Sequence, residues 1–216
     1  MMKLKNDISD KAVGRLSLYR RLLQELLENG RSQVFSHELA IRAGCTPAQV
    51  RRDIMNLEVL GSPAKGYEIQ KLMAGISSVL DSDAPQKVGL AGVGNLGRAI
   101  LAYFSGRTPQ FVITAAFDSD PTKVNRVIHG CRCYPVDELV SVVREENIQV
   151  GIVAVPAAEA QQVVDEFCRG GVLGLMNFAP VRVRVPVGVY VENLDVMAAL
   201  ERVAFFARRL SAVRGE

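Results

Sequence analysis

The feature that most constrains the fold is a glycine pattern in the middle of the chain. Residues 88–97 read Val-Gly-Leu-Ala-Gly-Val-Gly-Asn-Leu-Gly, so Gly92, Gly94 and Gly97 follow an apolar run and precede a helical pattern. A strand, a tight turn and a helix N-terminus in this order form the phosphate-binding start of a dinucleotide-binding fold. The first glycine permits the turn, the second lets the backbone approach a pyrophosphate, and the third lets the helix pack on the strand. The alternative is a glycine-rich turn that binds nothing.

An acidic residue after the next apolar run indicates which dinucleotide would bind. The run Phe111–Phe117 ends at Asp118, 21 residues beyond Gly97. A carboxylate there accepts hydrogen bonds from the adenosine ribose and repels a 2′-phosphate, so the pattern favours NAD(H) over NADP(H). Asp120 precedes Pro121 and is predicted to N-cap a helix, with a ribose contact as the alternative. The predicted phosphate and ribose contacts are Gly92, Val93, Gly94, Asn95, Leu96, Gly97, Asp118 and Asp120.

Strand and helix patterns alternate beyond Asp118. Strands are expected at 131–134, 148–155 and 173–178, with helices between them. This alternation predicts an α/β fold with a Rossmann-like, doubly wound parallel sheet. Ligands bind at the carboxyl ends of such strands, so the ends of the last two are predicted to line a nicotinamide pocket, with ordinary turns as the alternative. The residues concerned are Val155, Pro156, Asn177, Phe178, Ala179 and Pro180.

The C-terminal segment is too short for a separate substrate domain. Residues 181–191 alternate and contain Pro186, which predicts an edge strand or a hairpin. A helix is expected from about 194 to 210, and it carries more apolar side chains than one exposed stripe would need. We therefore expect this helix to pack on another subunit.

About 85 residues precede the glycine pattern, and they contain three short helical patterns. The first runs over 16–27 and stops at Asn29-Gly30, and Ser36 is predicted to cap the second, which ends at Gly44. Thr46 is predicted to cap the third, with Pro47 at its first position and Gln49 reaching back as in a capping box. Two helices joined by a tight turn form a helix-turn-helix.

The third helix and the segment after it carry the residues suited to DNA. Arg51 and Arg52 are predicted to lie outside the buried face, where Arg can bind guanine, and Gln49 can pair with adenine. Which arginine reads a base stays open. Residues 61–69 are predicted to form a wing, with Tyr67 and Ile69 on a returning strand and Lys65 near a phosphate. The predicted DNA-binding residues are Thr46, Gln49, Arg51, Arg52, Lys65 and Tyr67. A small helical dimerisation or docking domain is the alternative.

Composition and breaks in the strand and helix pattern predict the domain boundaries and the class of protein. The breaks predict a first domain over 1–83, a nucleotide domain over 84–192 and a C-terminal helical segment over 193–216. No apolar run is long enough to span a membrane and no signal peptide is recognisable, so a soluble, cytoplasmic protein is expected. Cys131 and Cys133 are spaced poorly for zinc, so no metal site is expected. They are expected to be structural thiols, with a redox role as the alternative.

Residues for catalysis are missing where a dehydrogenase would need them. The only histidines are His37 and His129, and the only lysines beyond residue 85 are Lys87 and Lys123. None follows a strand predicted to face the nicotinamide, so no proton donor stands beside a hydride. The pattern therefore predicts a non-catalytic sensor of NAD(H). Two alternatives stay open: an NAD-dependent oxidoreductase with a fused regulatory domain, and a regulator that binds another adenine nucleotide or CoA.

With these features together, the chain resembles the Rex family of redox-sensing transcriptional repressors along nearly its whole length. The segments that carry the resemblance are Gly14–Tyr19, Gln49–Ile54, Val93–Ala99, Phe117–Pro121, Val155-Pro156 with Ala160-Gln161, and Asn177–Pro180. The resemblance implies a homodimer with an N-terminal winged helix and a C-terminal Rossmann domain. It also implies that NADH releases the protein from palindromic operators, that NAD⁺ competes for the same site, and that the regulated genes serve anaerobic or NADH-oxidising metabolism.

The resemblance further implies a switch in which the terminal helix is exchanged between subunits. Arg15 would pair with Asp195 in one redox state, and Tyr103 would lie near that pair. The family pattern after this aspartate usually has an aromatic residue that reaches the pocket, whereas this chain has Val196. Val196 is either a neutral substitution or the mark of an altered NADH affinity or a weaker switch. The wing also looks shorter than the family pattern.

Overall fold

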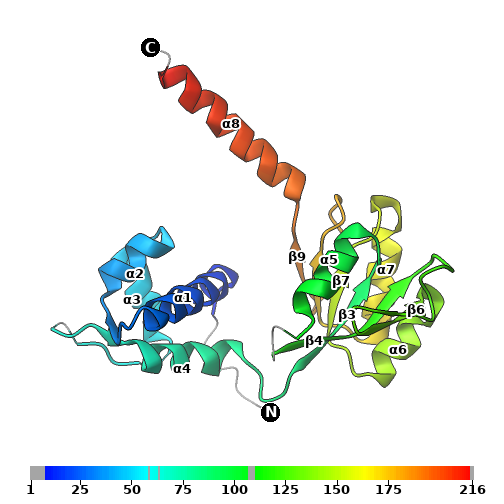
Figure 1. The fold of residues 1–216 in the computed structure, drawn as a ribbon, viewed down its shortest axis with the longest axis horizontal. Helices are drawn as coiled ribbons and strands as arrows, with labels where there is room; N and C mark the ends of the chain where they lie inside the picture. The colour runs from blue at the N-terminus through cyan, green and yellow to red at the C-terminus, as the bar shows by residue number, and fades with distance from the viewer. Residues whose placement is uncertain (1–7, 58, 63, 107–109, 215–216) are drawn as a thin grey trace. The chain divides into compact units, whose positions relative to one another are not determined.

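The computed structural model describes residues 8–57, 59–62, 64–106 and 110–214 (Figure 1). The chain divides into two compact units, Met1–Asp83 and Ala84–Glu216. Each unit has its own apolar core.

The first unit is a winged helix-turn-helix. Its elements are α1 (Asp10–Glu28), β1 (Gln33–Val34), α2 (Ser36–Ala43), α3 (Pro47–Met55), β2 (Tyr67–Glu68) and α4 (Ile69–Leu80). The two short strands pair antiparallel, and Gly44 turns the chain between α2 and α3 with a φ of 64°. The apolar side of α3 is buried: Val50 and Ile54, with Leu57 just beyond the helix, lie in a core with apolar side chains of α1 and α4.

Local details in this unit differ from the prediction. Phe35, not Ser36, is the N-cap of α2, because the Glu38 carboxylate accepts from the Phe35 backbone N–H at 2.8 Å. Thr46 does cap α3, accepting from the Gln49 backbone N–H at 3.2 Å. The Gln49 side chain does not complete a capping box, since its amide donates to Asp53 instead.

The wing is a tight hairpin. Ser62 and Gly66 form an antiparallel bridge, and Gly66 has a φ of 71° with the Val34 carbonyl oxygen only 2.5 Å from where a Cβ would stand. Tyr67 returns as a strand, as predicted, but Ile69 is the first residue of α4. The proline at position 63 lies outside the described residues.

The second unit holds a seven-stranded sheet in the order β5-β6-β4-β3-β7-β8-β9. Its strands are β3 (Gln86–Ala91), β4 (Phe111–Asp118), β5 (Val127–Ile128), β6 (Cys131–Pro135), β7 (Val150–Val153), β8 (Gly174–Asn177) and β9 (Tyr190–Asn193). All neighbours are parallel except β5 and β6, which form an antiparallel hairpin at one edge. Read from β6 to β9, this is the strand order of a Rossmann sheet, which confirms the predicted fold class.

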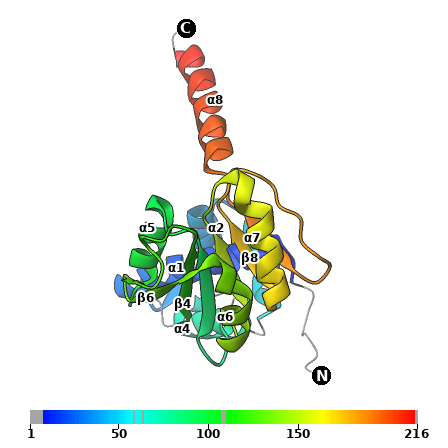
Figure 2. The same ribbon diagram turned by 90° about the vertical axis from the view of Figure 1, so that its right-hand side faces the viewer.

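Helices cover both faces of this sheet (Figure 2). One face packs against α5 (Asn95–Phe104), whose Ile100 and Leu101 are buried with β3 and β4 side chains. The other face packs against α6 (Leu139–Glu145), which follows a 3₁₀ turn (Val136–Glu138), and α7 (Ala157–Gly170). Because both faces are covered, the central strands are apolar on both sides.

One prediction in this unit is wrong, one is only partly right, and one short strand was not predicted. Asp120 caps a single turn and no helix: its carboxylate accepts from the Thr122 backbone N–H at 2.8 Å, but residues 121–125 do not continue as a helix. For the alternating segment 181–191, the edge-strand alternative holds only at its end, where β9 pairs parallel to β8 at the edge of the sheet, and no hairpin forms. The hairpin strand β5 was not predicted, since two residues carry too short a pattern.

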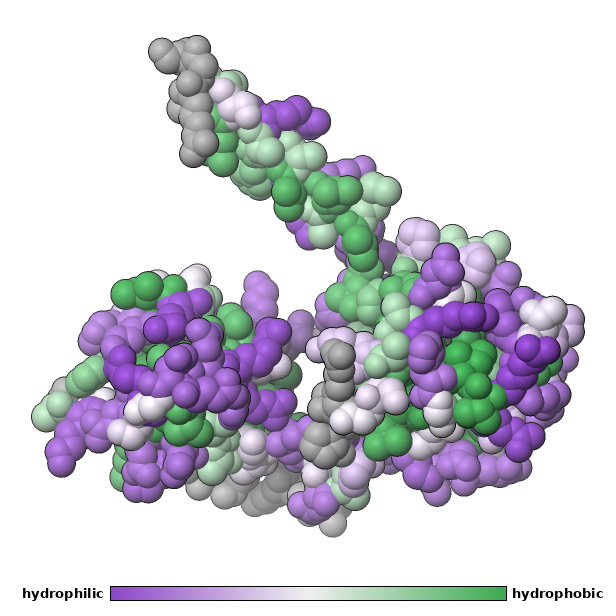
Figure 3. All heavy atoms as spheres, in the orientation of Figure 1, coloured by the Kyte–Doolittle hydropathy of each residue, from purple (hydrophilic) through white to green (hydrophobic). Residues whose placement is uncertain are grey.

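The chain ends in α8 (Val196–Arg214), close to the predicted helix. Its apolar side chains are exposed within the chain, and Figure 3 shows them as a green run along the helix. Those with described exposure are Val196, Met197, Leu200, Val203, Phe205, Phe206 and Leu210. An apolar helix of this kind lacks a partner within the described chain. Among the described residues, no helix is long and apolar enough to cross a membrane.

Candidate nucleotide and DNA sites

Three glycines shape the loop between β3 and α5, each in a different way. At Gly92 φ is 91°, and an added Cβ would lie 2.3 Å from the Ala154 carbonyl oxygen. At Gly97 an added Cβ would lie 1.9 Å from the Gly92 carbonyl oxygen, so helix and loop touch there. At Gly94, the N-cap of α5, an added Cβ would meet nothing within 4 Å. Gly92 and Gly97 therefore serve packing, while Gly94 leaves open space at the positive end of a helix, which suits a phosphate.

Asp118, at the carboxyl end of β4, binds the backbone of this loop. Its carboxylate accepts from the backbone N–H groups of Val93 at 2.7 Å and Asp120 at 2.9 Å. Lys123 also donates to it, at 3.2 and 3.3 Å, and pairs with Asp120 at 3.4 Å. Burial opposes the charge of Lys123, but the Asp118 and Asp120 carboxylates outweigh this and raise its pKa. The Thr122 hydroxyl and backbone N–H lower the pKa of Asp120.

The loop and the carboxylates line one cavity of about 310 Å³. This volume lies at the lower end of the range for small-molecule sites. Six predicted residues line it: Gly92, Gly94, Asp118, Asp120, Val155 and Pro156. Sequence reasoning missed Lys123, Val136 and Glu159, which line the same cavity. The signal for Val136 was available, because it follows the carboxyl end of the next strand, β6.

The other predicted cofactor residues lie around this cavity or further along the sheet. Val93 belongs to the loop and is fully buried, and Asn95 and Leu96 begin α5 with exposed side chains. Phe178, Ala179 and Pro180 follow β8, which is separated from β3 by β7. Strand order therefore puts them on the far side of Val155 from Asp118.

Asn177 has its side chain engaged inside the protein. It is 0% exposed, donates to the Val181 carbonyl at 2.8 Å and the Asn193 side-chain oxygen at 2.9 Å, and accepts from the Ala179 N–H at 3.0 Å. Its backbone carbonyl also accepts from Leu194 at 2.8 Å. Both amide hydrogens are therefore used to shape the end of β8 and tie it to β9.

The predicted DNA-binding side chains lie on the outer surface of α3 and on the wing. Arg51 and Arg52 are exposed, and Arg51 donates to the Ser36 hydroxyl at 3.2 Å. Lys65 is exposed at the tip of the hairpin, and Tyr67 is half-buried at its base. The outward position of Arg51 and Arg52 follows from the apolar stripe of α3, because burial of Val50 and Ile54 turns the opposite side of the helix outward.

Asp53 is a buried charge within α3 that sequence reasoning did not assign a role. Arg15 of α1 donates to its two oxygens from Nε at 2.7 Å and Nη2 at 2.8 Å. Tyr19 donates its hydroxyl at 3.0 Å, and Gln49 donates its amide at 2.9 Å. Burial disfavours ionisation of Asp53, but these hydrogen bonds outweigh burial and lower its pKa.

The residues predicted for the switch fall in both units. Arg15 belongs to the first unit, where it is paired with Asp53. In the second unit, Tyr103 is exposed on α5, Val196 is the exposed first residue of α8, and Asp195 caps that helix by accepting from the Ala198 N–H at 2.9 Å. Each stands at the surface or edge of its own unit.

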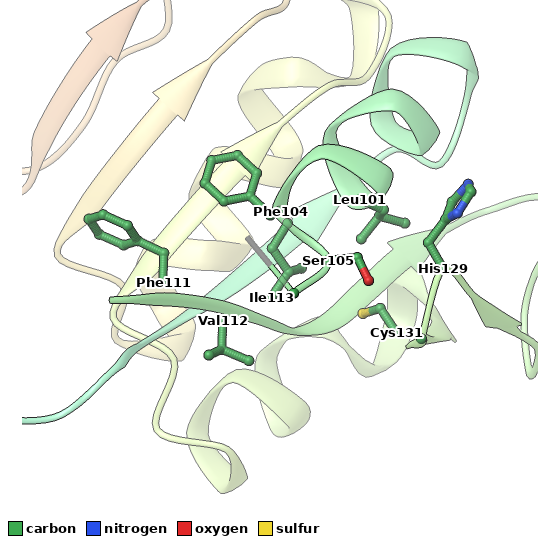
Figure 4. A pocket seen from close by; sticks show the side chains of 10 residues that line it. Leu101, Phe104, Ser105, Phe111, Val112, Ile113, His129 and Cys131 are labelled. Carbon is green, nitrogen blue, oxygen red and sulfur yellow. The ribbon is translucent and has the colours of Figure 1, made fainter. Parts of the chain in front are cut away.

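Figure 4 shows side chains that line a second cavity, of about 400 Å³. Its lining includes Phe111 and Val112, at the opposite end of β4 from Asp118, with His129 and Cys131 from the β5–β6 hairpin. Burial raises the pKa of the Cys131 thiol to about 12, and burial also raises that of Cys133. Raised pKa values keep both thiols protonated and unreactive, which favours the structural role. The described residues contain no cluster suited to a metal ion.

Comparisons with known proteins match two parts of the chain to two family models. Residues 7–54 match a family model described as "Putative DNA-binding protein N-terminus", and residues 83–181 match one described as "CoA binding domain". A redox-sensing transcriptional repressor Rex from Syntrophobacter fumaroxidans is 38% identical over 88% of this chain and 91% of its own length. The corresponding protein of Carboxydothermus hydrogenoformans is 38% identical over 94% of this chain and 97% of its own.

Solved structures are similar over the whole chain. The structure of RSP, a Rex-family repressor, has a TM-score of 0.88 at 28% identity and covers 98% of this chain and 100% of that one. RSP with β-NADH has a TM-score of 0.85 at 28% identity, and RSP with β-NAD⁺ and operator DNA has 0.86 at 29% identity. Each of these two covers 98% of this chain and 99% of that one.

Proposed function

We propose that this chain, which belongs to the Rex family of redox-sensing transcriptional repressors, binds operator DNA and releases it on binding NADH. Its first unit would hold the DNA and its second the nucleotide, with domains at 1–83, 84–192 and 193–216. The observation that carries the proposal is the open space at Gly94 beside the Asp118 carboxylate, in a chain that also has a winged helix. Its named relatives are repressors, so it acts as a regulator and not as an enzyme.

The nucleotide would lie along the carboxyl ends of the central strands. The pyrophosphate would meet the backbone at Gly92, Val93, Gly94, Asn95, Leu96 and Gly97. The adenosine ribose would bind Asp118, where its hydroxyls would replace the Lys123 ammonium, with Asp120 nearby. The nicotinamide would extend past Val155 and Pro156 toward residues 177–180, where the Asn177 side chain would hold the turn and Phe178, Ala179 and Pro180 would supply the surface. RSP binds β-NADH and β-NAD⁺, and we propose the same ligands here.

The DNA would meet α3 and the wing. Thr46, Gln49, Arg51 and Arg52 lie on α3 or at its start, and Lys65 and Tyr67 lie on the wing. We propose that the α3 residues enter the major groove and that the wing contacts the backbone. Replacing Lys65 by Ala should then lower the salt dependence of binding more than its sequence preference.

The active species would be a homodimer on a palindromic operator. The exposed apolar side of α8 supports packing on a second copy, in which the helix is exchanged between subunits. Arg15 of one subunit would then pair with Asp195 of the other in one redox state, with Tyr103 close by and Val196 facing the nucleotide. Because a repressor acts on operator DNA, we place it in the cytoplasm, without a membrane partner.

NADH can release DNA only if it binds the released conformation more tightly than the DNA-bound one. A hundredfold preference corresponds to about 2.7 kcal/mol of coupling. The test uses a duplex selected from a randomised pool by the full-length chain. Its binding is measured by fluorescence anisotropy without nucleotide, with NADH and with NAD⁺. NADH should weaken binding strongly and NAD⁺ little, and equal affinity in all three would overturn the proposal.

The same preparation separates the two other classes of function. Because one matching family model is described as a CoA binding domain, CoA is titrated as a competitor of NADH. We expect no displacement, since Asp118 would repel the 3′-phosphate of CoA. Steady oxidation of NADH with a small carbonyl compound would instead support an oxidoreductase.

A further inference from the structure

Asp53 is the buried charge that joins α1 to α3 in the first unit. Among the described residues it is the one buried side chain with a formal charge, at 3% exposure. It receives hydrogen bonds from two residues of α1, Arg15 and Tyr19, and from Gln49 one turn earlier on α3. The surrounding core is apolar, so these partners carry the compensation of its charge.

The carboxylate also decides how Gln49 is oriented. An ionised carboxylate only accepts hydrogen bonds, so the Gln49 amide must turn its Nε2 toward Asp53 and does so at 2.9 Å. The Gln49 oxygen is left as the acceptor for a group outside the domain. An acceptor at this place suits an amino group on a base edge, such as adenine N6 or cytosine N4.

Arg15 links the buried Asp53 carboxylate to the surface of the domain. Its side chain is 25% exposed, while that of Asp53 is 3% exposed, and the two form a bidentate pair. Loss of Arg15 from the pair would leave the Asp53 charge with two neutral donors, Tyr19 and Gln49. Removing the cation from a buried ion pair is strongly destabilising, because it leaves the charge of the carboxylate uncompensated.

We infer that Asp53 is a positioning residue for DNA recognition: it holds Gln49 in the base-reading orientation and makes that orientation depend on Arg15. This rests on the proposed DNA-binding function of α3. It goes beyond that function because it assigns sequence readout to a residue that does not itself reach the DNA surface. It also predicts that Gln49 and Asp53 act as one unit.

The experiment is a double-mutant cycle on full-length protein with the selected duplex. Asp53→Asn keeps the shape of the side chain and removes its charge, and Gln49→Ala removes the reading group. Each should weaken binding at least tenfold, and the double variant should bind no more weakly than the poorer single variant. Met55→Ala, on the same helix and 78% exposed, is the matched control and should bind normally.

The outcomes separate this inference from the proposed function. If the two single losses multiply in the double variant, or if Asp53→Asn binds normally, Asp53 does not act through Gln49. If Asp53→Asn fails to fold, Arg15→Lys replaces it in the cycle, because lysine cannot form the bidentate pair with Asp53. The criterion stays the same: the double variant with Gln49→Ala should bind no more weakly than the poorer single variant. If the unmodified protein selects no duplex, the proposed function itself fails, and that result is independent of the cycle.

Discussion

Replacing Gly94 by alanine separates the folding of the glycine loop from its use as a phosphate site. Gly94 has φ −78° and ψ −162°, which alanine adopts readily, and an added Cβ meets nothing within 4 Å. As an N-cap, alanine costs up to about 1 kcal/mol relative to glycine, and a similar amount is returned by the stiffer unfolded chain. The melting temperature should therefore stay within about 4 °C of wild type.

Binding of NADH should respond very differently. The methyl group occupies the space through which the pyrophosphate would reach the backbone N–H groups at the start of α5. Losing one hydrogen bond to a charged phosphate costs about 1.5–3 kcal/mol, which is about a 10- to 100-fold rise in Kd. NADH emission provides the assay, since the chain contains no Trp whose fluorescence would interfere.

The neighbouring glycines supply the contrast. Gly97→Ala and Gly92→Ala would press a Cβ against backbone oxygens at 1.9 and 2.3 Å, so both should lower stability as well as binding. Gly174→Ala is the control, because its Cβ would meet its nearest atom at 4.0 Å, at the start of β8 and away from the cavity. A folded Gly94→Ala protein with a Kd for NADH within twofold of wild type would refute the phosphate role of this loop.

Four other substitutions or conditions test the rest of the site. Asp118→Asn removes the carboxylate that would repel a 2′-phosphate and leaves Lys123 paired with Asp120 alone, so the preference for NADH over NADPH should fall at least tenfold in paired fluorescence titrations. An unchanged ratio would contradict the role of Asp118. Asn177→Ala leaves a buried N–H and a carbonyl without their partner, and urea unfolding should show a loss of about 1–3 kcal/mol. Arg51→Ala should weaken the selected duplex by about 1–3 kcal/mol while binding to random DNA changes little, if Arg51 reads a base. The pKa of Asp53 is lowered in the folded protein. The ionised carboxylate therefore stabilises the fold at a pH above its unfolded pKa, and this stabilisation is lost below about pH 4, as the pH falls through the folded pKa. Asp53→Asn should flatten the acid limb of a pH–stability curve.

Much of the fold could be predicted because its signals are local. Gly44 and Gly92 have positive φ angles, which glycine adopts more easily than other residues, so glycine at these positions indicates a turn. Thr46 followed by Pro47 indicates a helix start. The apolar runs of β3 and β7 predict strands buried on both faces, since only a covered parallel sheet needs them. Short or context-dependent elements, such as β5 and the turn at Asp120, lack such a signal.

Which polar groups meet depends on how the chain packs. Arg15 lies 38 residues from Asp53 in sequence, yet burial of the carboxylate makes that pair necessary. Lys123 reaches Asp118 only because the chain after β4 turns back on itself, and Asn177 meets Asn193 only because β9 lies beside β8. The backbone of the nucleotide loop and the positions of the main helices can be read from the chain, because they follow from local conformational preference. The partners of each buried charge and amide depend on packing across the chain, which no local pattern encodes.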